Sequence, residues 1–258
     1  MTVDALADLL ADATRVVAFT GAGISTESGI PDFRSPGGVW TRYDPRDFTF
    51  DRYVDSAEVR RNSWAMRREF FAAAPEPNAA HRALAELERE GRLTAVITQN
   101  IDGLHQAAGS RNVIEVHGTA REVMCIGDHP RAGIAEGCDF RAPTTWAFER
   151  IDAGDDDPRC PRCDGLVKSA TVSFGQAMFP EPLEVAAQHA TTAELLLTIG
   201  SSLQVYPAAG IPEAAKRAGA ALAILNDEAT PFDRIADVVV RGRAGEVLPT
   251  AVATALGR

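Results

Sequence analysis

Two glycines follow an apolar run near the start of the chain, in Thr20-Gly21-Ala22-Gly23-Ile24-Ser25 after Val16–Phe19. Backbone without side chains can approach a pyrophosphate closely, and the helix expected next would offer free N–H groups and positive potential. The pattern indicates a phosphate-binding turn, although a plain tight turn explains an isolated Gly-x-Gly equally well. Gly29 comes six residues after Gly23, and no acidic residue ends a second strand about 20 positions later, so the dehydrogenase fingerprint is missing.

Amide and carboxylate groups follow a second apolar run. Gln99-Asn100-Ile101-Asp102 comes directly after Leu93–Thr98, and polar groups at the end of a strand can orient a carboxamide and a ribose. Taken alone, the tetrapeptide fits better with Asp102 as the cap of a short helix and Asn100 in a turn.

A histidine ends a third run. His117 follows Val113–Val116, and an unperturbed imidazole accepts a proton near neutral pH, which suits a general base. A hydrogen-bonded structural histidine is the commoner role at such a position. We expect the other histidines to be surface, packing or supporting residues, with His105 nearest the site; they are His81, His105, His129 and His189.

These polar segments need a scaffold that brings the ends of strands together. The apolar runs are Val16–Phe19, Leu93–Thr98, Val113–Val116, Leu195–Ile199, Ala221–Leu225 and Ala236–Val240. Continuous apolar strands suit a parallel sheet covered on both faces. Between them, Asn78 can cap a helix that ends at Gly91, and Asp55 with Glu58 forms a capping-box pattern. We predict an α/β fold with a Rossmann-like parallel sheet and helices on both faces.

Two stretches do not fit this alternation. Residues 35–74 combine a loop rich in proline and glycine with an arginine-rich helix, and residues 120–167 hold all four cysteines. We expect both in a smaller lobe, as a helical insertion and a zinc-binding module. Residues 1–34, 75–119 and 168–258 then form the Rossmann-like domain, and ligands should bind in the cleft outside the carboxyl ends of its strands.

Charge and composition exclude several classes of function. The chain has 258 residues and a formal net charge of −10, which opposes binding to nucleic acid or to an anionic membrane surface. No window resembles a transmembrane helix, and the first residues carry Asp4 and Asp8 instead of a basic leader. Four cysteines are too few for a secreted disulfide scaffold. The sequence therefore predicts a cytoplasmic protein, most simply a monomer.

Four blocks together resemble the sirtuins, the Sir2 family of NAD-dependent protein deacylases. In family order they are Gly21-Ala22-Gly23-Ile24-Ser25 with Gly29-Ile30-Pro31-Asp32-Phe33-Arg34, Thr98-Gln99-Asn100-Ile101-Asp102-Gly103-Leu104-His105, Val116-His117-Gly118, and Gly200-Ser201-Ser202-Leu203-Gln204-Val205-Tyr206-Pro207. The resemblance covers nearly the whole chain, and four blocks in register are far more specific than one glycine motif.

The resemblance implies roles for individual residues. Asp102 and Ile101 would recognise nicotinamide, Gln99 and Asn100 the ribose beside it, and Phe33 would shield the reactive face. His117 would be the catalytic histidine, with Asn100 assisting. The remaining residues expected to bind NAD are Gly21, Ala22, Gly23, Ser25, Asp32, Arg34, Gly200, Ser201, Ser202, Asn226 and Ala244.

The reaction implied by the family is attack of an acyl-lysine carbonyl oxygen on the ribose C1′ of NAD, with loss of nicotinamide. Because an amide oxygen is a poor nucleophile, positioning supplies much of the acceleration. His117 would deprotonate a ribose hydroxyl so that the O-alkylimidate can rearrange, and water would then release free lysine and O-acyl-ADP-ribose. Protein mono-ADP-ribosyl transfer from the same pocket, or non-catalytic binding of NAD or ADP-ribose, are the alternatives.

The cysteines depart from the family pattern of two C-x-x-C pairs. Cys160 and Cys163 form one pair, but Cys125 is followed by Cys138 only thirteen positions later. Because zinc needs four ligands and thiolates outcompete a lone carboxylate, we expect Cys125, Cys138, Cys160 and Cys163 to form a closed tetrahedral site. Asp128 or His129 is the alternative to Cys138, and reduced cysteines without metal are the remaining possibility.

Substrate recognition is expected at two places. Sirtuins selective for acidic acyl groups carry Tyr-x-x-Arg where the expected helix Ser56–Ala73 has Trp64 and Arg67, which keeps a possible carboxylate partner but removes the phenol. With other segments this looks most like the class II subgroup and predicts a preference for larger or branched acyl groups over acetyl. A substrate peptide would add a strand along Val172-Ser173-Phe174-Gly175-Gln176, with Val172 and Phe174 beside the acyl-lysine.

Overall fold

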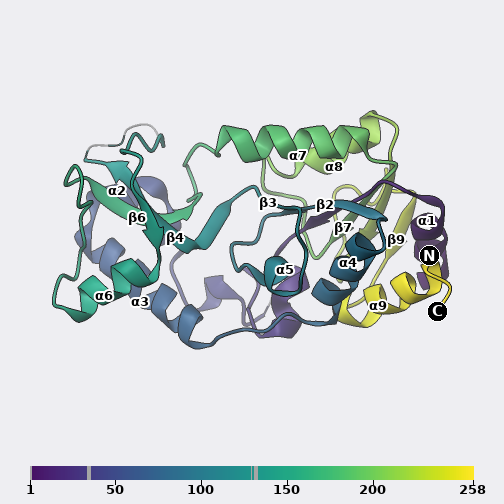
Figure 1. The fold of residues 1–258 in the computed structure, drawn as a ribbon, viewed down its shortest axis with the longest axis horizontal. Helices are drawn as coiled ribbons and strands as arrows, with labels where there is room; N and C mark the ends of the chain where they lie inside the picture. Colours follow the sequence, from purple (N-terminus) through teal and green to yellow (C-terminus); the bar gives the residue numbers. More distant parts are fainter. Residues whose placement is uncertain (1, 34–35, 129, 131–132) are drawn as a thin grey trace.

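A six-stranded parallel sheet forms the core of the larger lobe in the computed structural model, which describes residues 2–33, 36–128, 130 and 133–258 (Figure 1). Its order is β3-β2-β1-β7-β8-β9, so the chain reverses direction across the sheet between β1 and β7, where doubly wound folds bind ligands. The strands are β1 Val16–Thr20, β2 Leu93–Thr98, β3 Val113–Glu115, β7 Leu195–Ile199, β8 Ala221–Leu225 and β9 Val238–Val240. The predicted Rossmann-like sheet is confirmed.

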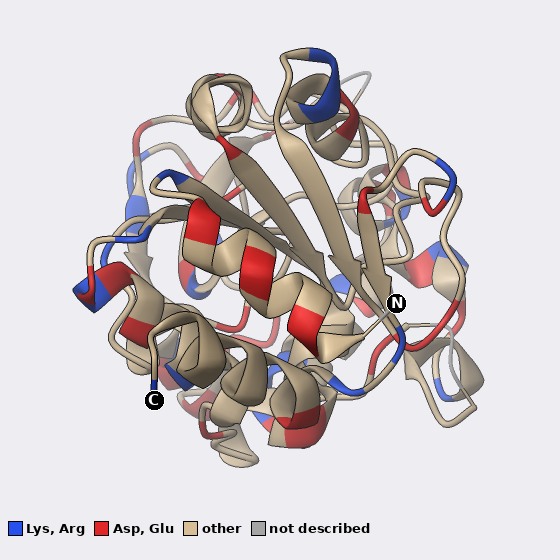
Figure 2. Ribbon diagram, turned by 90° about the vertical axis from the view of Figure 1, so that its right-hand side faces the viewer, with Lys and Arg blue, Asp and Glu red and all other residues tan. Residues whose placement is uncertain are grey.

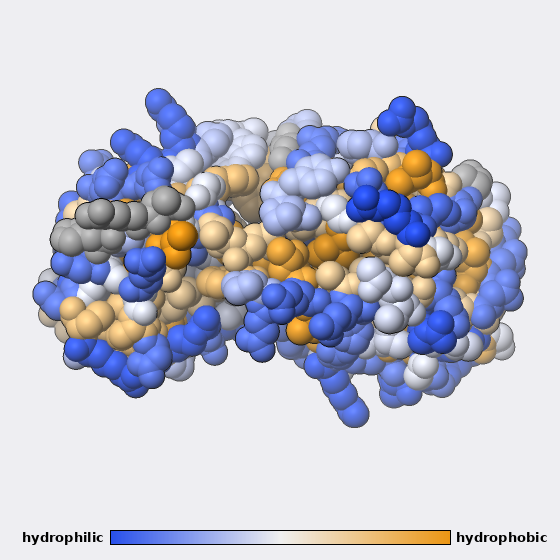
Figure 3. All heavy atoms as spheres, turned by 90° about the horizontal axis from the view of Figure 1, so that it is seen from above, coloured by the Kyte–Doolittle hydropathy of each residue, from blue (hydrophilic) through white to orange (hydrophobic). Residues whose placement is uncertain are grey.

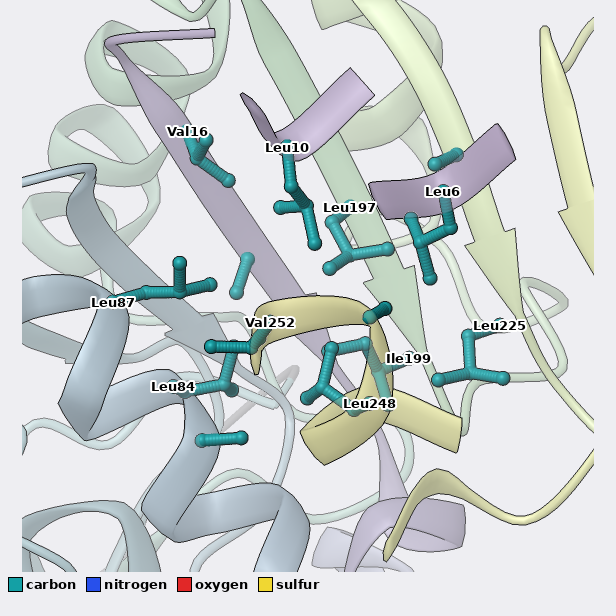
Figure 4. Packing of buried hydrophobic residues seen from close by; sticks show 14 of the residues in the cluster. Leu6, Leu10, Val16, Leu84, Leu87, Leu197, Ile199, Leu225, Leu248 and Val252 are labelled. Atoms are coloured by element: carbon teal, nitrogen blue, oxygen red, sulfur yellow. The ribbon is translucent and has the colours of Figure 1, made fainter. Parts of the chain in front are cut away.

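Helices cover both faces of this sheet. On one face lie α1 (Val3–Asp12), α4 (Ala79–Arg89) and α9 (Ala244–Ala255), and on the other α7 (Pro180–Thr192) and α8 (Gly210–Arg217), with the short α5 (Leu104–Ala107) beside α4. Figure 4 shows the packing on the first face, where side chains from three helices meet β1, β7 and β8. Its labelled residues are Leu6, Leu10, Val16, Leu84, Leu87, Leu197, Ile199, Leu225, Leu248 and Val252.

Local sequence signals explain where some helices begin and end. Helix α4 starts after Asn78, as predicted, because the Asn78 side chain accepts hydrogen bonds from the backbone N–H groups of Ala80 and His81. The chain leaves this helix through Gly91 at a φ of +73°. The cap predicted at Asp55 is wrong by one residue: Ser56 caps α3 by accepting from the backbone of Val59.

The smaller lobe is built around an antiparallel sheet of order β5-β4-β6. Its strands are β4 Gly118–Gly127, β5 Arg141–Pro143 and β6 Leu166–Thr171, and its helices are α2 Phe50–Asp55, α3 Ala57–Ala72 and α6 Thr145–Asp152. Three 3₁₀ helices complete the fold: η1 Ala22–Ser28, η2 Val39–Thr41 and η3 Pro45–Phe48. The α-helix expected after Gly23 is thus the 3₁₀ helix η1, which ends at Gly29 with φ of +85°.

Charged residues lie on the helices and loops around the large sheet, while its strands carry few (Figure 2). Strands β1 and β7 are buried along their whole length. Within the described part of the chain, no helix combines the length and apolar character that crossing a membrane requires.

Candidate active site

A cavity of about 1130 Å³ lies between the two lobes, outside the carboxyl ends of β1, β2 and β7. Figure 3 shows the surface hollowed between the lobes. The cavity brings together the described residues expected to bind NAD: Gly21, Ala22, Gly23, Ser25, Asp32, Phe33, Gln99, Asn100, Ile101, Asp102, Gly200, Ser201, Ser202, Asn226 and Ala244. His117, Arg67, Val172 and Phe174 also line it, whereas Arg34 falls outside the described residues.

The glycines after β1 and β7 are packed against each other. The backbone N–H of Gly23 donates to the carbonyl of Gly200 at 2.9 Å. A Cβ on Gly23 would lie 2.7 Å from Cα of Gly200, and a Cβ on Gly21 would lie 2.8 Å from the Gly200 carbonyl oxygen. Close contact between the two turns therefore requires these glycines before any ligand is present, and it also leaves their backbone exposed to the cavity.

A hydrogen-bond network fixes the polar groups after β2. Asn100 Nδ2 donates to the Gly21 carbonyl and to Ser25 Oγ, each at 3.1 Å, and Ser25 Oγ donates to Asp102 Oδ2 at 2.8 Å. The other Asp102 oxygen accepts from the backbone N–H of Leu104 at 2.9 Å. Asp102 thus supports the start of α5, as the capping interpretation predicted, and lines the cavity as well.

Two buried histidines support this network from behind. Ser25 Oγ lies 3.5 Å from His81 Nε2, and the rings of His81 and His105 are 4.8 Å apart. Thr20 Oγ1 lies 2.9 Å from His105 Nε2. Burial lowers the pKa of His81 to about 4 and that of His105 to about 3, so both rings are neutral at pH 7.

His117 has one ring nitrogen committed to the protein. Its Nδ1 lies 3.0 Å from the carbonyl oxygen of Gln99, and because a carbonyl can only accept, Nδ1 carries the proton. Nε2 is then the atom that can accept a proton from a ligand. Burial lowers the pKa of His117 below its ordinary value, against the opposing effect of the bond to Gln99. The backbone N–H of Val172 also holds the His117 carbonyl at 2.9 Å.

Further polar residues connect the ends of the strands around the cavity. Gln99 Nε2 donates to Ser201 Oγ at 2.8 Å, which ties the end of β2 to the turn after β7. Asn226 follows β8, and its Nδ2 donates to the Glu228 carbonyl at 2.8 Å. Ala244 is the first residue of α9 and stands beside this end of the cavity.

The two α3 residues proposed for acyl recognition, Trp64 and Arg67, lie in different environments. Arg67 lines the cavity, but Trp64 does not: it is 2% exposed and packs in the core of the small lobe with Val123, Cys125 and Phe140. The expectation for Trp64 is therefore corrected, because its apolar ring is buried behind the cavity wall. Two residues that we did not predict, Tyr53 and Lys168, line the cavity instead. For Lys168 a signal was available in the sequence, because it is the one charged residue in the run Leu166-Val167-Lys168-Ser169-Ala170.

The segment expected to pair with a peptide is not a regular strand. Strand β6 ends at Thr171, and the backbone of Phe174 already bonds to Phe48 and Phe50. The Ser173 N–H is not free to donate to a peptide either, because it donates to Gln176 Oε1 at 3.0 Å. The expectation of a free edge along this whole segment is corrected. Val172 and Phe174 nevertheless line the cavity, and Phe174 is exposed.

The four cysteines converge in the small lobe. Their sulfur atoms all lie within 4.8 Å of one another, with Cys125 to Cys163 and Cys138 to Cys160 each at 3.5 Å. A tetrahedral zinc site with Zn–S bonds of about 2.3 Å needs sulfur atoms roughly 3.8 Å apart, so the four thiols fit this metal. Asp128 pairs with Arg159 instead, and His129 lies outside the described residues.

Comparison with known proteins agrees with this geometry. A model of the Sir2 family matches residues 21–207. The chain is 49% identical over 251 residues to NAD-dependent protein deacetylase 1 of Bradyrhizobium diazoefficiens, covering 95% of this chain and 93% of that protein. It is 46% identical over 239 residues to NAD-dependent protein deacetylase 2 of Streptomyces coelicolor, covering 91% and 95%. A solved structure described as "Sir2-p53 peptide-NAD+" matches with a TM-score of 0.86 and 36% identity, covering 100% of this chain and 99% of that one.

Proposed function

The chain belongs to the Sir2 family, and from that premise we propose that it is an NAD-dependent enzyme that removes acyl groups from lysine side chains of proteins or peptides. One observation carries the proposal: His117, with its Nδ1 bonded to Gln99, lines the same cavity as the glycine turns and the Asn100–Asp102 network. A candidate general base and a set of groups suited to bind a dinucleotide therefore line the same cavity.

The residues of the large lobe fit NAD in an extended conformation. The glycine turns after β1 and β7 offer backbone groups to the pyrophosphate, and Asn226 and Ala244 lie where the adenosine would end. Asp102 and Ile101 would receive the nicotinamide carboxamide, and the amides of Gln99 and Asn100 the adjoining ribose. The support is that Asn100 and Asp102 are already oriented by Ser25, so binding needs little side-chain ordering.

His117 would act on a ribose hydroxyl. When bound, NAD supplies an electrophilic anomeric carbon with nicotinamide as leaving group. The protein's part is to hold the acyl oxygen in line with that carbon and to take up the hydroxyl proton at Nε2 of His117. Burial lowers the pKa of His117 and so favours the neutral ring, which is the form that can accept this proton.

Aromatic side chains would screen the reaction from solvent. Phe33 is 39% exposed at the cavity, and its ring centroid lies 5.1 Å from that of Trp40. Trp40 also contacts Phe48 and Phe174, so the group extends over the mouth of the cavity. We place Phe33 where it would shield the anomeric carbon after nicotinamide has left.

We further propose that acyl groups larger than acetyl are preferred. The part of the cavity beside α3 has apolar side chains in its wall, namely Val59, Met66 and Phe70. Turnover of acetyl-lysine peptide equal to or faster than that of every longer acyl peptide would contradict this preference.

The four cysteines would hold one structural zinc in the small lobe, away from the residues assigned to the reaction. The structure has all four as free thiols, which suits a reducing compartment such as the cytoplasm. A single chain already contains every residue assigned to the reaction, which supports a monomer as the active unit.

The test is release of nicotinamide from NAD in the presence of acyl-lysine peptides. His117→Ala should reduce turnover by about 10²- to 10⁴-fold, the range expected for loss of a general base. His189→Ala is the matched control, because His189 lies on α7 and does not line the cavity. In the unaltered enzyme, turnover should fall on acidification as His117 becomes protonated, and because burial lowers the pKa of His117 this fall should come at a lower pH than for an unperturbed histidine. Unchanged nicotinamide release by His117→Ala would refute the proposal.

A further inference from the structure

An ion pair between Glu115 and Arg121 brackets the proposed base. Glu115 is the last residue of β3, two positions before His117, and Arg121 lies on β4, four positions after it. Arg121 Nη2 donates to Glu115 Oε2 at 3.0 Å, and Arg121 Nε donates to Thr119 Oγ1 at 3.0 Å. The two side chains therefore close a loop of the chain that has His117 inside it.

The same arginine lies over the segment that we propose for nicotinamide. A Cβ on Gly103 would lie 3.0 Å from Cδ and 3.1 Å from Nε of Arg121, so the arginine side chain packs directly on the backbone of Gly103. Gly103 has a φ of +76° and directly follows Asp102. The backbone N–H of Ala120, the neighbour of Arg121, donates to the Ile101 carbonyl at 3.0 Å. Two contacts from the start of β4 therefore hold this segment in place.

Glu115 connects this arrangement to the large sheet. It pairs in register with Thr98, the last residue of β2, and the proposed nicotinamide segment follows that strand. The Glu115 side chain is 16% exposed, and that of Arg121 is 47% exposed. Burial raises the pKa of Glu115, and the charge of Arg121 opposes this shift because it favours the carboxylate. Arg121 thus stabilises a partly buried acid and links β4 of the small lobe to β3 of the large lobe.

The next residue along β4 takes part in an ion pair without these contacts. Arg141 of β5 donates to Glu122 at 3.1 Å, and both side chains are about half exposed. This pair joins two strands of the small sheet, and neither residue lines the cavity, whereas Arg121 does. An exposed ion pair of this kind contributes little by itself. The pair of Arg121 differs in what it spans, namely the proposed base and the proposed nicotinamide segment.

Resting on the proposed function, we infer that Arg121, anchored by Glu115, is a positioning residue for the nicotinamide end of NAD. It holds the backbone of Ile101 and Asp102 in the conformation that receives the carboxamide, and it fixes the turn that carries His117. Its effect passes through the backbone of the segment after β2. The groups proposed for the pyrophosphate and the adenosine belong to other elements, the turns after β1, β7 and β8, so their binding does not depend on Arg121.

The test compares two ligands that share adenosine and pyrophosphate and differ at the nicotinamide end. One is ADP-ribose, and the other is an NAD analogue with CH₂ in place of the ring oxygen of the nicotinamide ribose, so that nicotinamide is not released. Calorimetry measures both on the zinc-loaded full chain in the presence of an acetyl-lysine peptide. Arg121→Met should weaken binding of the analogue by about threefold to fivefold, the scale of a partly exposed ion pair, and leave the affinity for ADP-ribose unchanged.

Glu115→Gln tests whether the arginine depends on its anchor. This change keeps the shape of the side chain and removes its charge, so it should also weaken binding of the analogue more than that of ADP-ribose. The double variant of Glu115→Gln with Arg121→Met should bind the analogue no more weakly than Arg121→Met alone, because both changes break the same link. Fully additive effects of the two changes would overturn the role of Glu115 as the anchor.

Arg141→Met is the matched control, because it breaks the neighbouring ion pair of the same strand outside the cavity, and it should leave the ratio of the two affinities unchanged. A merely structural role of Arg121 would weaken both ligands equally or neither, and either result would overturn the inference. Failure of the proposed function is a separate result: the unaltered chain would then release no nicotinamide from NAD with any acyl-lysine peptide, while the ratio of the two affinities still decides the role of Arg121. Binding of neither ligand by the unaltered chain would refute both.

Discussion

The two lobes are stabilised in different ways. The large lobe has continuous apolar layers on both faces of one sheet, contributed by five helices and the strands themselves. The small lobe has two separate clusters, one of which includes Cys125 and Cys160, and a buried ion pair between Arg60 and Asp157. A broad apolar core therefore positions the side of the cavity that we propose for NAD, whereas a few specific polar contacts and the cysteine site position the side that we propose for the acyl group.

Removal of the metal should give the largest difference in stability between the two lobes. Structural zinc sites contribute roughly 10–16 kcal/mol of apparent binding energy to their modules, so Cys160→Ser or a strong chelator should unfold the region around β4, β5 and β6. Hydrogen exchange would measure this as lost protection in residues 118–171, with protection in α1, α4 and α9 retained. Protection of both regions after complete metal removal would contradict the comparison.

Loss of the buried ion pair should have the next largest effect. Arg60 also donates to the carbonyls of Tyr53 and Val54 at the end of α2, and Asp157 would be left without its partner in Arg60→Met. Removing one member of a fully buried pair costs about 3–5 kcal/mol, and because the Asp157 side chain is 20% exposed we expect a loss toward the lower end of that range. Denaturant unfolding followed by a small-lobe probe would measure the loss.

The control for this variant is Arg162→Met, which removes an exposed arginine whose partner Asp139 is also exposed. That change should alter the free energy of unfolding by no more than about 1 kcal/mol. Equal effects of the two variants would show that burial is not what gives the Arg60 pair its importance.

Gly23→Ala tests the large lobe, where we expect a steric clash, and not the loss of a charge, to lower the stability. The added Cβ would meet the backbone of Gly200, which cannot move without shifting β7, so we expect a loss of about 1–3 kcal/mol in the free energy of unfolding and weaker NAD binding. Gly210→Ala is the control, because its Cβ would make only ordinary contacts with Tyr206. A fully stable Gly23→Ala variant with unchanged NAD affinity would contradict the interlocked turns.

The smallest effect is expected at the cap of α4. Asn78→Ala removes the cap and the bond from Nδ2 to the Ile24 carbonyl at 2.7 Å, and loss of such a cap typically costs about 1 kcal/mol. Thermal unfolding would measure the change. Because α4 is also anchored by Leu84 and Leu87, a loss as large as that from Arg60→Met would show that the apolar core contributes less than the comparison assumes.

Much of the large lobe could be predicted because its strands are apolar runs with clear ends. The predicted strand Ala236–Val240 is shorter by two residues, Val238–Val240, and the other runs match their strands within one residue. Residues that follow these strands meet in the cavity because the carboxyl ends of parallel strands lie at one edge. The roles of single residues there, such as Asp102 toward nicotinamide, stay predictions.

The small lobe was harder to predict because its contacts join distant segments. Asp55 and Ser56 are both good caps, and only the packing of α3 selects Ser56. Trp64 and Arg67 lie one turn apart, yet one enters the core and the other the cavity. Lys168 faces Arg67 only because β6 pairs with β4 beneath α3, which no local pattern contains.

His117 and Gly118 lie at a point where two chain connections between the lobes are in contact. Strand β4 starts directly after His117, and strand β6 ends directly before Val172. The backbone N–H of Val172 donates to the His117 carbonyl. Gly118, at a φ of +76°, lets the two crossings touch at the Ala170 carbonyl. The imidazole therefore lies where two of the chain connections between the lobes meet, so its position depends on the packing of both lobes.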